Sequence, residues 1–216
     1  MSFAERRAEM VGVQLKGKGI NDSLVVRAFS KVPREEFVLP ADRERAYFDR
    51  ALPIGRGQTI SQPWTAAFML QSLKLKAGER VLEVGSGSGY LLALISRIVG
   101  KKGKVFGVEK VEELAERSRM TLSRLGYANV GVVWGDGRVG FSGEAPFGAV
   151  VVSAGAEEIP KELILQLTLK GRLIIPVGRG GDDDRDFSLQ MMLVLRKRGR
   201  IIKKALGGKY VFVRLV

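Results

Sequence analysis

Histidine and cysteine are both absent from the 216 residues of this chain. Without cysteine there is no disulfide framework, and without either residue no Cys/His zinc site can form. Ser-His-Asp and Cys-His nucleophiles are excluded as well, because their histidine base is missing. No stretch approaches 18 apolar residues, so we expect no membrane span and no membrane partner. The first residues do not resemble a signal peptide, and we therefore expect a cytoplasmic protein.

Positive charge and glycine are both abundant. Lys and Arg number 36 against 23 Asp and Glu, a formal net charge of +13, and glycine accounts for 27 residues. Such a glycine excess predicts tight turns or close approach of the backbone to a ligand. The densest basic stretch, 196–204, is interpreted as a solvated hairpin end, with an RNA-binding patch as the alternative. Three adjacent aspartates lie in 180–184; we interpret that stretch as a solvated loop and expect no metal site.

Residues 1–77 are predicted to form a helical and loop extension that precedes the main fold. Residues 1–50 look helical and polar, with Asn21 or Asp22 as a helix cap. The stretch 51–63 is dense in proline and glycine and predicts an ordered loop. A helix is expected over 64–73.

From residue 78 the pattern changes to short apolar strands that alternate with helices. Strands are expected at 80–84, 104–108, 130–134, 149–153 and 172–177, and helices at 90–99, 111–125 and 159–169. This alternation predicts an α/β fold with a doubly wound, Rossmann-like and mostly parallel sheet. Three further strands, 188–196, 200–206 and 210–216, predict an antiparallel C-terminal edge. Residues 78–216 are thus expected to be the core, in one compact domain with the extension.

A glycine-rich turn follows the first strand of this core. Its sequence runs from Glu83 to Tyr90, with glycine at Gly85, Gly87 and Gly89. A dinucleotide fingerprint has the spacing G-x-G-x-x-G, which would need glycine in place of the tyrosine. The order acid-x-G-x-G-x-G is instead typical of class I methyltransferases, and it predicts S-adenosyl-L-methionine (SAM) as the cofactor.

Two acidic residues follow the next strands and support this interpretation. Glu109 ends the second strand, where a carboxylate can accept both ribose hydroxyls of a nucleoside. Asp136, between Gly135 and Gly137, follows the third strand and can accept from the adenine amino group. Since parallel strands end at one edge of the sheet, these groups are expected to converge with the glycine turn. We therefore expect Glu83, the three loop glycines, Glu109, Asp136 and Gly137 to bind the cofactor.

Five segments follow one another along the chain: Val32–Phe37, Leu52–Pro63, Glu83–Tyr90, Gly135–Gly137 and Gly171–Gly178. Their order resembles that of the protein-L-isoaspartate O-methyltransferase family. The resemblance covers the chain from about Val32 to its end, and the Gly-Gln-Thr-Ile-Ser-Gln-Pro stretch is its most specific part. It implies a repair enzyme that moves a methyl group from SAM to the α-carboxyl group of L-isoaspartyl residues in damaged proteins, leaving S-adenosyl-L-homocysteine. We expect a monomer that acts on isoaspartyl proteins or peptides and not on nucleic acid.

The resemblance also implies which residues meet the substrate. Ser61 matches the active-site serine of the family, and Thr59 and Ile60 match the neighbours that enclose the substrate. Trp64 stands where the family commonly has a His-Met or Tyr-Met pair, and it keeps an aromatic ring. The segment that includes Val213 matches the closing aromatic-Val-Pro-Leu sequence, with Arg214 in place of proline. Both departures concern substrate fit more than cofactor binding.

The missing histidine does not obstruct this reaction. A carboxyl group with a pKa near 4 is ionised at neutral pH and needs no general base. Ser61 is therefore expected to position the substrate as a hydrogen-bond donor and not to act as a nucleophile; capping of the following helix is the alternative. The alternative functions are methylation of RNA or a small molecule, and SAM binding without activity.

Overall fold

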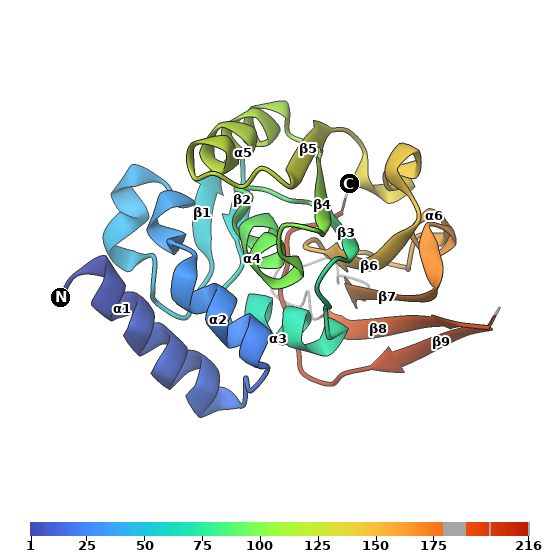
Figure 1. Cartoon of the computed structure of the whole chain (residues 1–216), viewed down its shortest axis with the longest axis horizontal. Helices are drawn as coiled ribbons and strands as arrows, with labels where there is room; N and C mark the ends of the chain where they lie inside the picture. The colour runs from blue at the N-terminus through green and yellow to red at the C-terminus, as the bar shows by residue number, and fades with distance from the viewer. Residues whose placement is uncertain (179–188, 199, 216) are drawn as a thin grey trace.

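The computed structural model describes residues 1–178, 189–198 and 200–215, so the acidic stretch 180–184 lies outside the described residues. Its centre is a seven-stranded sheet, and a two-stranded hairpin lies beside it (Figure 1). The strands are β1 (Leu52–Gly55), β2 (Gln58–Ile60), β3 (Arg80–Val84), β4 (Lys104–Glu109), β5 (Val130–Trp134), β6 (Phe147–Val152), β7 (Leu167–Val177), β8 (Gln190–Lys197) and β9 (Arg200–Ala205). The α-helices are α1 (Phe3–Glu9), α2 (Ser23–Lys31), α3 (Pro63–Leu73), α4 (Tyr90–Val99), α5 (Glu112–Arg124) and α6 (Lys161–Leu165). Short 3-10 or π turns are η1 (Met10–Leu15), η2 (Lys16–Lys18), η3 (Arg34–Glu36), η4 (Pro40–Arg45), η5 (Gly137–Val139) and η6 (Ser142–Glu144).

The large sheet has the strand order β5-β4-β3-β6-β7-β8-β9. From β3 the chain runs outward through β4 to β5 and then returns to β6 on the other side of β3. The strands from β5 to β7 are parallel, whereas β8 and β9 add antiparallel pairs at the edge. The predicted doubly wound, mostly parallel sheet is thereby confirmed. Its reversal point lies between β3 and β6, and this is where such sheets bind ligands.

Alternate residues of the strands enter two different cores. Val81 and Val151 belong to a buried cluster that continues into α2, α3, α4 and α5 and into the N-terminal segment. Leu82 and Val150 belong to a second cluster on the opposite face, completed by residues of α6 and β7. The period of two along each strand produces this division. The helices on the first face connect the N-terminal segment to the sheet.

The N-terminal segment is helical as predicted, but its expected polar character is wrong. Met10 and Leu15, both on η1, are fully buried. Asp22 provides the predicted cap of α2, because its carboxylate accepts from the backbone N–H groups of Leu24 and Val25. The apolar residues of this segment are spaced around short, irregular turns, so they do not form one clear stripe in the sequence.

Residues 51–63, predicted to be an ordered loop, contain regular secondary structure. They contain the antiparallel hairpin of β1 and β2, in which Leu52 and Ile60 are paired and buried. Left-handed φ angles of 93°, 55° and 70° at Gly55, Arg56 and Gly57 form its turn. The alternation of buried and exposed residues covers only four residues in β1 and three in β2. It is too short to be recognised in a stretch so rich in proline and glycine.

Two predictions near the C-terminus are wrong. The helix expected over 159–169 is limited to α6, and the following strand begins at Leu167, because Leu167 pairs with Phe147 at the start of β6. The third edge strand, over 210–216, is absent among the described residues. There the chain makes two isolated bridges, Tyr210 with Leu189 and Arg214 with Gly155. It therefore crosses the end of the sheet instead of extending its edge.

One edge of the sheet is β9, and all six of its residues are exposed. It pairs with β8 in the hairpin predicted from the basic stretch, and Figure 1 shows this hairpin extending away from the body, opposite the N-terminal helices. Lys203 and Lys204 lie on this exposed strand. Lysine on an edge strand opposes pairing with another sheet. Among the described residues, no helix is long and apolar enough to cross a membrane.

Candidate functional site

A cleft opens at the carboxyl ends of the central strands, and segments that are distant in sequence line it. The hairpin β1–β2, the glycine loop, the end of β4, the loop after β6 and the C-terminal segment all contribute. The predicted site residues that line it are Thr59, Gly85, Gly87, Glu109, Gly137 and Val213. The structure therefore brings residues from the predicted cofactor side and from the predicted substrate side to one cleft.

The glycine loop has a backbone that other residues rarely adopt. Gly85, Gly87 and Gly89 have φ angles of 75°, 50° and 84°. A Cβ atom on Gly89 would lie 3.0 Å from Leu122 Cδ1 of α5, so this glycine serves the packing of α5. Gly85 and Gly87 line the cleft, where they leave the backbone open to a ligand.

Glu109 connects the glycine loop to the end of β4. It is 6% exposed; its Oε2 accepts from the Gly87 N–H at 2.7 Å and its Oε1 from the Val111 N–H at 2.9 Å. A carboxylate offers about four lone-pair positions, so each oxygen retains one for a further donor. Two ribose hydroxyls are donors of this kind. The carboxylate and the bare glycine backbone together fit the nucleoside part of SAM.

The hairpin β1–β2 packs directly on the glycine loop. A Cβ atom on Gly87 would lie 3.0 Å from Ile54 Cδ1. The Ile54 carbonyl accepts from the guanidinium of Arg117 on α5, and Arg56 forms an ion pair with Glu113 of the same helix. The substrate-side hairpin is thus attached to the helix that follows Glu109.

The C-terminal segment closes another side of the cleft. The Gly155 N–H donates to the Val213 carbonyl at 2.7 Å, and the Leu215 N–H donates to the Gly155 carbonyl at 2.7 Å. Both bonds bypass the backbone N–H of Arg214. The arginine that replaces the proline of the resembling family is therefore compatible with the same backbone pairing.

Ser61 lies directly after the hairpin and is half-buried. Among the described residues, its hydroxyl has no hydrogen-bond partner. It does not cap α3: the N-cap position is Gln62, and the Trp64 N–H donates to Asp49 Oδ1 at 3.2 Å instead. The capping interpretation of Ser61 is therefore wrong, and its hydroxyl remains available. Ser61 does not itself line the cleft, whereas Thr59 does.

Two other predicted substrate residues have structural contacts. Ile60 is buried in the larger core and anchors β2. The Trp64 ring stacks on Phe68 with a centroid distance of 5.2 Å, and its indole N–H donates to the Lys18 carbonyl at 3.2 Å. Neither residue lines the cleft. The structure therefore does not bring these two predicted substrate residues into the cleft.

Glu83 lies beneath the cleft and does not line it. It is 2% exposed, and its Oε1 accepts from the Ser153 hydroxyl at 2.8 Å, which connects β3 to the loop after β6. Its Oε2 has no hydrogen-bond partner among the described residues. Burial raises the pKa of Glu83 well above its ordinary value of 4.5, and the nearby charge of Glu109 raises it further.

Asp136 and Gly137 differ in their position. Asp136 does not line the cleft; Arg138 hydrogen-bonds and pairs with its carboxylate at 2.7 Å, and this interaction lowers the pKa of Asp136. A Cβ atom on Gly137 would lie 2.3 Å from Val84 Cγ1, so glycine is required there by the end of β3.

Sequence reasoning missed several residues that line the cleft, including Ile54, Gln58, Lys110 and Ser153. Ile54 and Gln58 lie inside the segment Leu52–Pro63, whereas Lys110 and Ser153 directly follow the strands β4 and β6. These positions were the signal in the sequence that could have identified them. Among the residues that the structure describes, no group of three or more Asp or Glu side chains is arranged to hold a metal ion.

Gly87→Ala is expected to weaken binding of S-adenosyl-L-homocysteine at least about tenfold, because the added methyl group meets Ile54 and strains a left-handed backbone. Isothermal titration calorimetry measures this affinity. Gly126→Ala is the matched control, since Gly126 has a φ of 76° and nothing within 4 Å of an added Cβ atom. The control should lose stability but retain affinity; equal affinity of both variants would contradict a cofactor role for the glycine loop.

Glu83→Gln is expected to remove a loss of stability that accompanies rising pH. Since the native pKa of Glu83 is raised, the native state binds more protons than the unfolded state above pH 4.5, and the wild type weakens relative to the variant as pH rises. The slope is at most about 1.4 kcal/mol per pH unit. Urea unfolding at pH 5, 6, 7 and 8 measures the difference. No histidine titrates in this range, and a difference that stays constant with pH would contradict the raised pKa.

Comparison with known proteins identifies the family. A family model described as protein-L-isoaspartate(D-aspartate) O-methyltransferase matches residues 5–216. Protein-L-isoaspartate O-methyltransferase 2 of Pelobacter propionicus is 48% identical over 194 residues, which is 90% of this chain and 82% of that protein.

Solved structures show the same similarity. A protein-L-isoaspartate O-methyltransferase structure has a TM-score of 0.84 and 31% identity, and the match covers 96% of this chain and 65% of that one. A beta-aspartate methyltransferase from Plasmodium falciparum, solved in complex with S-adenosyl-L-homocysteine, has a TM-score of 0.82 and 29% identity, covering 96% of this chain and 97% of that one. This chain belongs to the protein-L-isoaspartate(D-aspartate) O-methyltransferase family.

Proposed function

We propose that this chain transfers a methyl group from SAM to the α-carboxyl group of L-isoaspartyl residues in damaged proteins. Membership of the family supports this reaction. The structural observation that carries it is the contact of the β1–β2 hairpin, which Ser61 directly follows, with the glycine loop through Ile54 and Gly87. This contact brings a hydroxyl-bearing substrate segment to the edge of a nucleoside-binding cleft.

On the cofactor side, we propose that Glu109 accepts the ribose hydroxyls and that Gly85 and Gly87 admit the ligand to their backbone. When bound, SAM supplies a methyl group on a sulfonium sulfur, and S-adenosyl-L-homocysteine is the product. Glu83 supports the loop from below through Ser153. We propose that the Asp136 carboxylate accepts from the adenine amino group while it remains paired with Arg138.

On the substrate side, we propose that the Ser61 hydroxyl donates a hydrogen bond to the substrate carboxylate. The carboxylate oxygen forms the new bond to the methyl carbon while the carbon–sulfur bond breaks. The electron pair of the broken bond remains on sulfur. No proton has to be moved, because a carboxyl group is ionised at neutral pH. Alignment of the reacting groups and exclusion of water are therefore the tasks of the cleft. Thr59 and Val213 line it on this side, while Ile60 and Trp64 support it.

The proposal extends to organisation and location. We propose that residues 1–77 carry the substrate-side motif and that residues 78–216 form the SAM-binding core, which also contributes Val213 to the substrate side, in one compact domain. We also propose a monomeric, cytoplasmic enzyme that acts on polypeptides and not on nucleic acid. Light scattering of the purified protein tests the monomeric state, and the expected result is the mass of one chain.

The purified protein is expected to methylate an isoaspartyl peptide and not its normal aspartyl twin. Labelled SAM is incubated with each peptide and, separately, with transfer RNA. Methylation of neither peptide would contradict the proposal; methylation of the RNA would support the alternative substrate class, and SAM binding without turnover would support an inactive binding protein.

Ser61→Ala is expected to lower kcat for the isoaspartyl peptide about ten- to hundredfold, because one donor to the substrate carboxylate is removed. The affinity for S-adenosyl-L-homocysteine should change less than about twofold. Ser142→Ala, on the exposed turn η6, is the control and should retain full activity. An equal loss of turnover and cofactor affinity would show that Ser61 serves the cofactor instead.

A further inference from the structure

Arg34, on the short turn η3, is an arginine with no exposed surface. It forms no ion pair with any described carboxylate, and its Nη1 has no hydrogen-bond partner among the described residues. Burial lowers the pKa of Arg34. A buried cation without a contacting carboxylate is costly, and apolar side chains of similar volume would fill the same space at less cost. Packing alone therefore does not explain why this buried position holds a guanidinium group.

The guanidinium joins three segments that are distant in sequence. Its Nη2 donates to the Ser61 carbonyl at 2.8 Å, and its Nε donates to the Ala46 carbonyl at 2.7 Å. Its Cζ lies 4.9 Å from the centre of the Tyr90 ring. Tyr90 is the first residue of α4, directly after Gly89 of the glycine loop. One side chain thus contacts both the substrate segment and the helix that begins at the cofactor loop.

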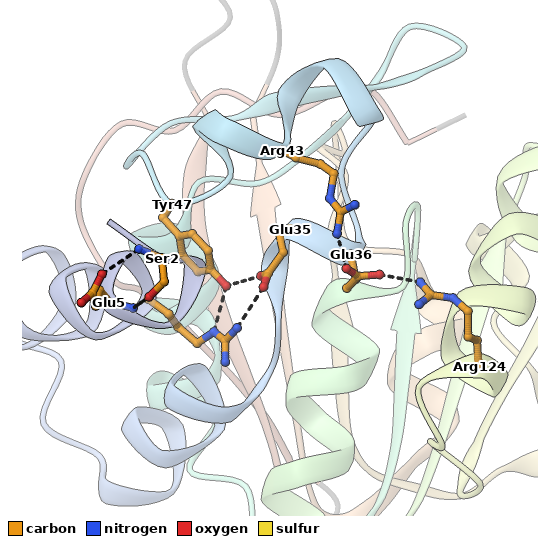
Figure 2. A network of polar contacts seen from close by, with 8 residues as sticks. Ser2, Glu5, Glu35, Glu36, Arg43, Tyr47 and Arg124 are labelled. Carbon is orange, nitrogen blue, oxygen red and sulfur yellow. Dashed lines mark hydrogen bonds and ion pairs between the residues drawn. The ribbon is translucent and has the colours of Figure 1, made fainter.

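The turn that carries Arg34 is itself held from two sides. Figure 2 shows Glu35 bonded to Tyr47 and Glu36 bonded to Arg43 and to Arg124 of α5. Arg7 of α1 adds a further bond to Glu35 at 3.0 Å. The backbone of η3 is therefore fixed relative to the N-terminal segment and to α5. Arg34 therefore extends from a turn that is held in place by its two neighbours, Glu35 and Glu36.

The substrate segment is held on the other side of Ser61 as well. The Trp64 N–H donates to Asp49 Oδ1 at 3.2 Å, and Asp49 Oδ2 accepts from Lys18 Nζ at 2.6 Å. The backbone around Ser61 is thus restrained before and after the helix start, while the Ser61 hydroxyl makes no hydrogen bond with the described residues. Restraint of the main chain with a free side-chain donor is the arrangement that a positioning role requires.

We propose that Arg34 is a positioning residue, which fixes the Ser61 hydroxyl relative to the glycine loop through the Ser61 carbonyl and the Tyr90 ring. This inference rests on the proposed function, since the orientation of Ser61 matters for turnover only if its hydroxyl meets the substrate. A lysine at this position has one ammonium group and cannot reproduce the planar fork that reaches two carbonyl oxygens.

Arg34→Lys is the first test. We expect kcat/KM for the isoaspartyl peptide to fall about tenfold, because Ser61 is no longer held in one place. The dissociation constant of S-adenosyl-L-homocysteine should stay within about threefold of wild type. Arg34→Gln, which is neutral and can still donate to one carbonyl, replaces it if the buried ammonium prevents folding.

A double-mutant cycle with Ser61→Ala separates positioning from general destabilisation. If Arg34 acts through the Ser61 hydroxyl, Arg34→Lys should lower kcat/KM less than about threefold in the Ser61→Ala background. A tenfold loss in both backgrounds would overturn the proposal, because it would show that Arg34 acts independently of the hydroxyl. An unchanged kcat/KM in the single variant would overturn it too.

Arg172→Lys is the matched control. Arg172 also donates to several groups, including the Leu73 carbonyl and the Glu79 carboxylate, but it lies at the opposite end of the sheet from the cleft. This variant should lose stability and retain kcat/KM when assayed below its melting temperature. A comparable loss of kcat/KM would overturn the assignment of a special role to Arg34.

Hydrogen exchange supplies a measurement that does not depend on activity. Arg34→Lys should accelerate amide exchange in residues 58–64, and Arg172→Lys should not. If exchange there is unchanged, the proposal fails whatever the reaction is. If exchange is accelerated but the wild type methylates no isoaspartyl peptide, the proposed function fails while the restraint by Arg34 is established.

Discussion

The left-handed backbone of the glycine loop is the constraint around which the site is built. Because Gly87 has no Cβ atom, Ile54 of the β1–β2 hairpin can lie against it. Its N–H is then held by the Glu109 carboxylate, which couples β3 to β4. The loop after β6 contacts Gly85 through Ala154. Four separate segments thus meet at one turn, and a side chain at Gly87 would press on Ile54 of the β1–β2 hairpin.

The chemistry of the family suits a chain without histidine. An ionised carboxylate is its own nucleophile, so the protein has to orient groups and exclude water instead of transferring protons. The structure reflects this task. Hydrogen bonds from Arg117 and Arg34 hold the Ile54 carbonyl of the β1–β2 hairpin and the Ser61 carbonyl directly after it. Glu83, whose pKa is raised by burial, lies beneath the cleft, where its bond to Ser153 supports the loop.

The positive charge has a different role in different places. Two arginines near the N-terminus have a structural role. Arg7 and Arg34 both form hydrogen bonds with other segments of the N-terminal region. The lysines of β9 are exposed on the edge strand, where their charge discourages pairing of the sheet with another chain. The positive charge therefore includes both structural cations and cations that protect an exposed edge.

Periodicity and motif spacing predicted the parallel sheet, α4 and the glycine-rich turn between β3 and α4. Each depends on a local pattern: apolar runs of strand length, an apolar stretch of helix length after Gly89, and three alternate glycines. The same local information failed where partners are distant. The period of two in β1 and β2 is too short to outweigh the turn glycines Gly55 and Gly57. The segment at 210–215 changes partners between Leu189 and Gly155. Ser61 could be identified from its motif, but only tertiary structure decides that Asp49 caps α3 and that Arg34 reaches the Ser61 carbonyl. Hydrogen bonds between segments 27 residues apart leave no periodic trace in a sequence, since they depend on how the chain returns.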